Sequence, residues 1–193
     1  MKHTEKTIQD NLFSHYSQNS KFRIPNIYLF MWESDFFVTK DNGYCYEFEI
    51  KISRSDFKNE KKKVDKHSIL KTGSYIYQKK EYMYDGNKFK RDENNQIMFD
   101  IIPETITQKR PNKFFYIVPE GLIGAHEIPS YSGLMYVNDS GDIRTIREAP
   151  FLHKEKINFD KELCMKFYHY WMNERYKRII LEREKQSNYE NHI

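Results

Sequence analysis

Residues 44–53 alternate between apolar and polar side chains, and this pattern constrains the fold more than any other feature of the chain. A repeat of two is typical of a β-strand, in which alternate side chains lie on the same face. One face carries Glu47, Glu49 and Lys51. The other carries the apolar residues Tyr46, Phe48, Ile50 and Ile52. We therefore expect a strand with one face on a hydrophobic core and a cluster of charge on the other.

The segments around this strand predict an alternation of helices and strands. The Asn-Gly pair at 42–43 is typical of a tight hairpin turn, so we expect residues 35–39 to form a strand paired with it. Ser53 or Ser55 can cap a following helix that ends near Gly73. The other expected elements are a helix at 4–16, strands at 27–31, 114–118, 134–137 and 143–146, and a helix at about 159–185.

The length of 193 residues predicts a single domain over 1–193, with one core and an elaboration. We expect that elaboration to be an inserted hairpin at about 74–112. Its tyrosines alternate with lysines, and they can either stack on unpaired bases or pack onto the body. The helix at 159–185 has apolar residues at helical spacing, which predicts that they join the core. These residues include Phe159, Leu163, Phe167, Trp171 and Ile179.

Composition excludes several classes of protein. Phe, Tyr and Trp make up 31 of the 193 residues, which argues against a disordered chain. No apolar run reaches the roughly 18 residues of a membrane span, and residues 1–10 are too polar for a secretory signal. Cys45 and Cys164 form no recognisable metal or disulfide pattern. We expect a reduced, cytoplasmic compartment, or the host cytoplasm if a phage encodes the chain.

Positive charge is concentrated in one short segment. Residues 51–66 contain seven Lys or Arg and three acids, and this excess of +4 equals the net charge of the whole chain. A localised basic stripe is typical of a face that binds phosphate. The same stripe can also be the solvated face of an ordinary helix, and both interpretations stay open.

Asp35, Glu49 and Lys51 are the residues in which we expect chemistry. If the hairpin pairs its two strands, the three side chains converge. Two carboxylates at close range can bind Mg²⁺, which prefers oxygen ligands and needs only one or two carboxylates. Such a cation stabilises charge on a phosphoryl oxygen and lowers the pKa of a bound water. Lys51 would position or help deprotonate that water. The alternative is a salt bridge on a half-exposed strand.

The residues around this trio resemble the PD-(D/E)XK nuclease superfamily. The resemblance rests on Glu33-Ser34-Asp35 followed by EFEIKISRSDF at 47–57, and within the superfamily it points to the MmcB-like DNA-repair proteins and their phage relatives. It implies a restriction-endonuclease-like core, with the order helix, three strands, helix and strand (αβββαβ) and a central mixed sheet flanked by helices. The resemblance covers about 27–73 and 112–155, including similar stretches at 114–123, 133–137 and 146–150.

The resemblance implies roles for individual residues. Asp35 and Glu49 would hold Mg²⁺, for which Mn²⁺ would substitute, and the Ile50 carbonyl would be a further ligand. Lys51 would be the catalytic lysine. Members of the superfamily often add an acid from the first helix. The candidates for it are Glu5, which fits by position, and alternatively Gln9 or Asp10.

The resemblance also implies a nucleic-acid surface on the basic segment. The residues expected to contact nucleic acid are Ser53, Arg54, Lys58, Lys62, Lys63, Lys66 and His67. Glu33 is two residues from Asp35, and Glu47 is two residues from Glu49, so both are expected on the strand face that carries the site. They are either further ligands or solvated acids. Ser34 stands where the family motif has a proline before the first acid.

The implied function is metal-dependent hydrolysis of phosphodiester bonds, as by an Mg²⁺-dependent endodeoxyribonuclease of DNA repair or of a phage. DNA is the expected partner; RNA and a homodimer stay open, and no membrane is expected. One alternative is a module of the same fold that binds nucleic acid without cutting it. Another is a protein-interaction factor, such as a phage protein that acts on a host partner, which the aromatic-rich insertion would favour.

Overall fold

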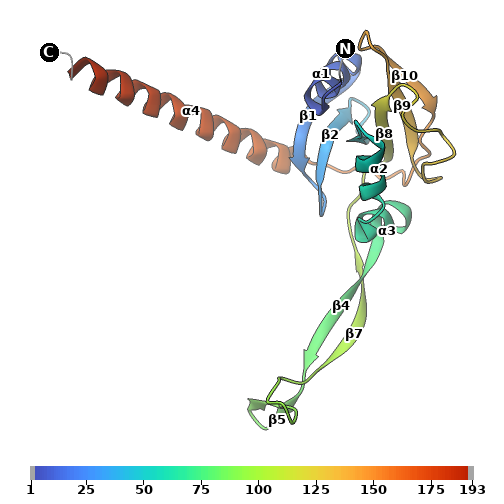
Figure 1. Cartoon of the computed structure of the whole chain (residues 1–193), viewed down its shortest axis with the longest axis vertical. Coiled ribbons are helices and arrows are strands. Elements are labelled where there is room, and N and C mark those ends of the chain that lie inside the picture. The colour runs from blue at the N-terminus through green and yellow to red at the C-terminus, as the bar shows by residue number, and fades with distance from the viewer. Residues whose placement is uncertain (1–2, 191–193) are drawn as a thin grey trace. The chain divides into compact units, whose positions relative to one another are not determined.

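The computed structural model describes residues 3–190 of the chain, with side chains up to residue 184. The chain divides into two units, Met1–Lys156 and Ile157–Ile193. The first unit contains the central sheet, the shorter helices and an inserted ribbon, and the second contains one long helix (Figure 1).

A mixed six-stranded sheet forms the centre of the first unit. Its strands are β1 (Ser20–Tyr28), β2 (Glu33–Lys40), β3 (Cys45–Ile50), β8 (Lys113–Pro119), β9 (Gly133–Val137) and β10 (Ile143–Arg147), in the spatial order β1-β2-β3-β8-β9-β10. The first three strands form an antiparallel meander. β3, β8 and β9 run parallel, and β10 returns antiparallel to β9.

Helices cover both faces of this sheet. They are α1 (Glu5–His15), α2 (Arg54–Glu60) and α3 (Val64–Thr72). α1 packs Ile8 and Leu12 on the face that carries Phe48. α2 and α3 cover the opposite face, through Phe57 and Ile69 among others. Because β3 is buried on both sides, its charged face lies beneath α2 and α3 rather than in solvent.

Several expectations from the sequence are confirmed. The architecture is mixed α/β, with a central mixed sheet and a long C-terminal helix. Residues 40–43 form the tight turn between β2 and β3, in which the Gly43 N–H donates to the Lys40 carbonyl at 2.9 Å. Gly43 has a φ of 86°, a conformation that favours glycine. Ser53 caps α2 by accepting from the Asp56 N–H at 3.2 Å.

Two segments differ from the expected elements. The first strand begins at Ser20 rather than at 27, and it contains Pro25. A proline is tolerated there because β1 is an edge strand of the sheet. The basic segment forms two helices, α2 and α3, with a break at 61–63, where a single helix is expected.

The expected hairpin at 74–112 forms an antiparallel ribbon. It consists of β4 (Ser74–Tyr82) and β7 (Phe99–Thr107), with the short strands β5 (Tyr84–Asp85) and β6 (Lys88–Phe89) beyond them (Figure 1). Tyr75 packs against the core beneath α3, whereas Tyr77, Tyr82 and Tyr84 are exposed. The insertion therefore packs onto the body only at its base.

The long helix α4 (Asp160–Glu190) does not bury the predicted apolar stripe. Phe159 and Leu163, at its start, are buried, but Phe167 and Trp171 are exposed by 68% and 47%. Exposed aromatic residues such as Tyr170 occupy successive positions around the helix, so there is no single apolar side to bury. Among helices within residues 3–190, none is long and apolar enough to cross a membrane.

Candidate active site

The β2–β3 pairing brings together the acids that the sequence places on separate strands. Phe36 pairs with Phe48 and Phe37 with Glu47, so Asp35 lies level with Glu49. Next to these pairs, a side chain rather than a backbone carbonyl accepts the hydrogen bond of β3. The Ile50 N–H donates to Asp35 Oδ2 at 2.7 Å. The expected convergence of the two acids therefore occurs, at the end of the hairpin.

Lys51 lies directly beside Glu49. Its Nζ is 2.7 Å from Glu49 Oε1, 3.4 Å from Glu60 Oε2 and 3.5 Å from Asp56 Oδ1. The Lys51 side chain is only 7% exposed, although it comes directly after β3. The ammonium group is therefore surrounded by carboxylates, two of which come from α2.

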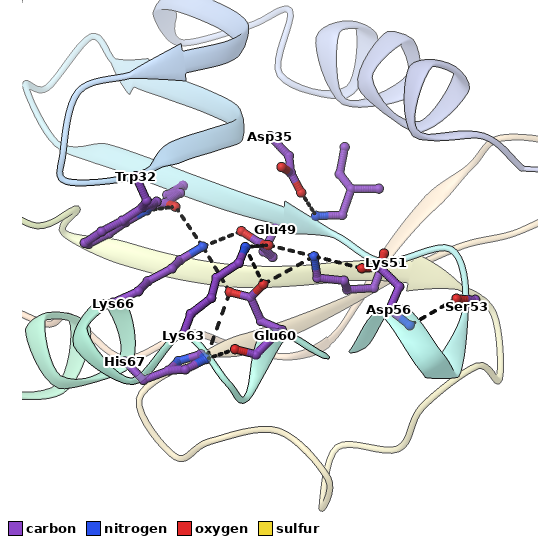
Figure 2. A network of polar contacts seen from close by, with 12 residues as sticks. Trp32, Asp35, Glu49, Lys51, Ser53, Asp56, Glu60, Lys63, Lys66 and His67 are labelled. Atoms are coloured by element: carbon purple, nitrogen blue, oxygen red, sulfur yellow. Dashed lines mark hydrogen bonds and ion pairs between the residues drawn. The ribbon is translucent and has the colours of Figure 1, made fainter. Parts of the chain in front are cut away.

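Two further lysines reach Glu49 from the helices above the sheet. Lys63 Nζ lies 3.2 Å from Glu49 Oε1 and 2.7 Å from Glu60 Oε2. Lys66 pairs with Glu49 Oε2, and its Nζ lies 3.2 Å from Glu60 Oε1 and 3.6 Å from Glu47 Oε1. Figure 2 shows the three ammonium groups between Glu49 and Glu60. We call Glu47, Glu49, Glu60, Lys51, Lys63 and Lys66 the charge cluster.

Two acids of the charge cluster are buried with incomplete hydrogen bonding. Glu47 is fully buried; Trp32 Nε1 donates to its Oε1 at 2.6 Å, and its Oε2 has no hydrogen-bond partner among the described residues. Neither carboxylate oxygen of Glu60 has one either, and ion pairs with lysines hold this side chain. Glu47 is thus not a solvated acid. Glu49 is both hydrogen-bonded and ion-paired to the lysines, whereas charge pairing alone holds Glu60.

The environment changes the pKa of the central groups in opposite directions. Burial, with the Glu49 charge as a second cause, raises the pKa of Asp35 to about 7. Burial likewise raises the pKa of Glu47 to about 7, although Lys66 and Trp32 oppose it. Burial disfavours ionisation of Glu49 too, but Lys66 and Lys51 outweigh it and lower its pKa. The pKa of Lys51 is raised against burial by Glu49 and Glu60, so Lys51 is protonated at neutral pH.

The candidates from the first helix form a chain that ends at Asp35. Gln9 is buried, and its Nε2 lies 3.0 Å from the Asp35 carbonyl oxygen and 2.8 Å from Asn26 Oδ1. Glu5 Oε1 accepts from the same Nε2 at 3.1 Å. Asp10 pairs with Lys6 on the exposed side of α1. Gln9 therefore contacts the backbone of Asp35 and not its carboxylate, and Glu5 is linked to Asp35 only through Gln9.

The residues expected to contact nucleic acid fall into two groups. Lys58 and Lys62 are exposed, and Lys63 is half-exposed. Lys66 is 4% exposed and paired with three acids, so it does not lie on an outer face as expected. It is drawn inside because Ile69 and Leu70, three and four residues later, turn the same side of α3 to the core.

The remaining residues of that set have internal partners. Ser53 serves as the cap of α2. Arg54 donates to Glu127 Oε2 at 2.5 Å and to the Leu122 carbonyl at 2.7 Å. His67 Nδ1 lies 2.6 Å from the Tyr131 hydroxyl, and its Nε2 lies 3.0 Å from the Glu60 carbonyl oxygen. Burial lowers the pKa of His67, so this ring is neutral at pH 7.

Sequence reasoning missed Glu60 and Trp32. Glu60 follows Phe57 by three residues, and this spacing places both on the buried side of α2. The charge of Glu60 by itself suggests a solvated residue, so the charge pattern hides this signal. Trp32 lies in the connection between β1 and β2, and no regular pattern in the sequence links it to Glu47. Within the described part of the chain, no group of three or more His, Cys, Asp or Glu has the arrangement of a metal site.

Comparison with known proteins assigns no family. No protein-family model and no curated protein matches the chain. Among solved structures, the chain is similar to the "SPO1766 protein of unknown function from Silicibacter pomeroyi". That similarity has 14% sequence identity and a TM-score of 0.48, and it covers 89% of this chain and 85% of the other.

Proposed function

We propose that the protein is a metal-dependent nuclease of the PD-(D/E)XK type that hydrolyses phosphodiester bonds, with DNA as its substrate. The observation that carries this proposal is the convergence of Asp35, Glu49 and Lys51 where β2 and β3 part. The order α1, β1–β3, α2–α3, β8 supports it, because it follows the restriction-endonuclease-like order of elements that the sequence resemblance implies.

The donor set fits Mg²⁺, with Mn²⁺ as a substitute. Asp35 and Glu49 lie level on neighbouring strands and supply two carboxylates on the same face of the sheet, and the Ile50 carbonyl is a further candidate ligand. Burial and, second to it, the Glu49 charge raise the pKa of Asp35, so the two acids repel each other in a poorly solvated place. A divalent cation would relieve that repulsion, and Mg²⁺ needs only one or two protein carboxylates. When bound, it would supply charge stabilisation at phosphorus and activation of water.

Lys51 contributes as a cation rather than as a base. The acids around it raise its pKa, so the ammonium form dominates at neutral pH. A protonated lysine beside the scissile phosphate can orient the attacking water and offset the negative charge that develops on the phosphoryl oxygens. Asp56 and Glu60 both lie on α2 and pair with the Lys51 ammonium group, so α2 fixes the position of that group.

A cleavage assay tests this function. Labelled linear, nicked, single-stranded and branched DNA would be incubated with the protein in Mg²⁺, Mn²⁺ or EDTA. We expect cutting with either metal, none in EDTA, and a loss of at least about a hundredfold in Asp35→Asn and Lys51→Met. Cutting that both variants retain would remove these residues from the mechanism.

A module that binds nucleic acid without cutting it is the second candidate. One observation favours it: both oxygens of Glu49 are already paired with lysines, Lys63 on one and Lys66 on the other. Under this alternative no substrate is cut in any metal, while salt-sensitive binding persists. A protein that neither cuts nor binds DNA would instead point to a protein partner, for which the exposed β4–β7 ribbon is the candidate surface.

A further inference from the structure

A cavity opens next to the charge cluster, on the side of Lys63 and Lys66. It has a volume of about 360 Å³ and lies between the β1–β2 connection and the start of α3. Its lining combines positive charge with apolar surface. The lining residues that matter here are Met31, Trp32, Lys62, Lys63, Val64 and Lys66.

The chemistry of the lining suits an anion that also has an apolar face. Lys62, Lys63, Lys66 and one acid, Asp65, line the cavity. Lys63 and Lys66 are also paired with Glu49 and Glu60, so the exposed Lys62 and the half-exposed Lys63 are the lysines that a phosphate can reach. Met31 and Val64 are exposed by 43% and 70%, so they add apolar surface to the lining beside the charged site. A nucleotide offers both features at once, a phosphate for the lysines and a base for the apolar side chains.

The volume of the cavity suits an occupant the size of one nucleotide. Cavities that enclose small ligands span about 300–1,000 Å³, and this one lies near the lower limit. Phe30 stacks on the Trp32 ring at 5.3 Å between centroids, and Lys66 lies over the ring at 5.5 Å. The faces of the Trp32 ring are therefore taken, and a base would pack on Met31 and Val64 instead.

Lys63 connects this cavity to the candidate active site. Its Nζ lies 3.2 Å from Glu49 Oε1, the same oxygen that Lys51 contacts at 2.7 Å. A phosphate bound by Lys63 would consequently lie next to both groups. The Lys63 side chain is 48% exposed and belongs to the break between α2 and α3, so a phosphate can reach its ammonium group from solvent.

We propose that this cavity binds one unpaired nucleotide of the strand that the protein acts on, with its base on Met31 and Val64 and its phosphate on Lys62 and Lys63. The inference rests on the proposed function, because it takes the bound strand to be the one that is cut. It specifies the substrate class as single-stranded or locally unpaired nucleic acid, since a base that packs on Met31 and Val64 has left its stack in the duplex. A blunt duplex would have to open to place a base in the cavity.

Equilibrium binding in EDTA tests the cavity separately from cleavage. The probes are a labelled short oligothymidylate and a blunt duplex of the same length. We expect wild type to prefer the single strand, and Lys63→Met, Lys62→Met and Met31→Ala each to weaken single-strand binding about tenfold. Lys71→Met is the matched control, because Lys71 is an exposed lysine in the last turn of α3. It should bind within about twofold of wild type.

A second readout comes from Trp32, which lines the cavity. The chain has two tryptophans, so Trp171→Phe leaves Trp32 as the sole indole emitter. Its fluorescence should change when the oligothymidylate binds, and thermal unfolding checks that each variant is folded. Single-strand binding that Lys62→Met, Lys63→Met and Met31→Ala leave intact would overturn the cavity assignment, whether or not the protein cuts. If these variants lose binding but wild type cuts nothing, the cavity stands and the nuclease proposal fails.

Discussion

Lys66 carries a charge inside the protein, and its partners make that position tolerable. The ammonium group lies among Glu47, Glu49 and Glu60, all of them buried. Removing it would leave three buried carboxylates with one less counter-charge. We expect Lys66→Met to lower the free energy of unfolding by about 3 kcal/mol or more. Lys71→Met removes an exposed charge from the same helix and should change the free energy of unfolding by less than about 0.5 kcal/mol.

Urea unfolding of both variants measures this difference. The method is suitable because the midpoint and the slope separate a change in stability from a change in compactness. If Lys66→Met and wild type have equal free energies of unfolding, water reaches the Lys66 ammonium group and the charge cluster is open to solvent.

Glu47 makes the stability of the protein depend on pH. Its pKa is about 7 in the folded state against 4.5 ordinarily, so the folded state holds the proton more tightly. The stabilisation is present at low pH and is lost as the pH rises through 7. We expect wild type in EDTA to lose about 2 kcal/mol more between pH 5.5 and 7.5 than Glu47→Gln, which cannot titrate. Parallel slopes of stability against pH for the two proteins would contradict the assignment.

At the level of residues, the sequence predicts the parts of the site that lie on regular strands. The period of two and the Asn-Gly turn together place Asp35 beside Glu49, and the register confirms this. Glu60 and Lys66 escape prediction because a charged residue on a helix is ordinarily solvated. Only the packing of Phe57 and Ile69 turns them inward.

At the level of elements, the β4–β7 ribbon is attached to the body but contributes little to its core. Nearly all residues of both strands are exposed, and only the base of the ribbon packs inward. Ile76 pairs with Thr105 near that base. We expect replacement of residues 77–104 by an Asn-Gly turn to leave the thermal midpoint within about 3 °C of wild type, because little apolar surface is lost. A variant that fails to fold would show that the ribbon stabilises the body.

The break between α2 and α3 illustrates what local sequence does not specify. Neither proline nor glycine occurs at 61–63, and the three consecutive lysines fit a helix as well as a turn. The break follows from packing, since Phe57 and Glu60 of α2 and Lys66 of α3 all have to face the same sheet surface. It also gives Lys63 the exposed position on which the cavity proposal depends.

At the scale of the whole molecule, the sheet separates the two kinds of buried surface. The α1 side is apolar, and the α2–α3 side combines apolar residues with the charge cluster. The sequence predicts this α/β arrangement well, because β3 has a period of two and the central strands β8 and β9 are short continuous apolar runs. Hydrophobic periodicity fails for α4, where aromatic residues such as Trp171 have helical spacing yet remain exposed. The aromatic residues of α4 occupy several sides of the helix, so helical spacing alone does not single out one apolar side.

We propose that Asp35 and Glu49 hold the metal with which Lys51 assists hydrolysis, and one comparison of variants tests this proposal. It is the single-turnover rate of Mg²⁺-dependent cleavage of a labelled single strand by wild type, Glu49→Gln and Glu120→Gln. Glu120 is an exposed acid that pairs with Arg144, and it controls for the loss of one carboxylate. We predict a loss of at least about a hundredfold in Glu49→Gln and an unchanged rate in Glu120→Gln. Equal rates in all three proteins would contradict the account.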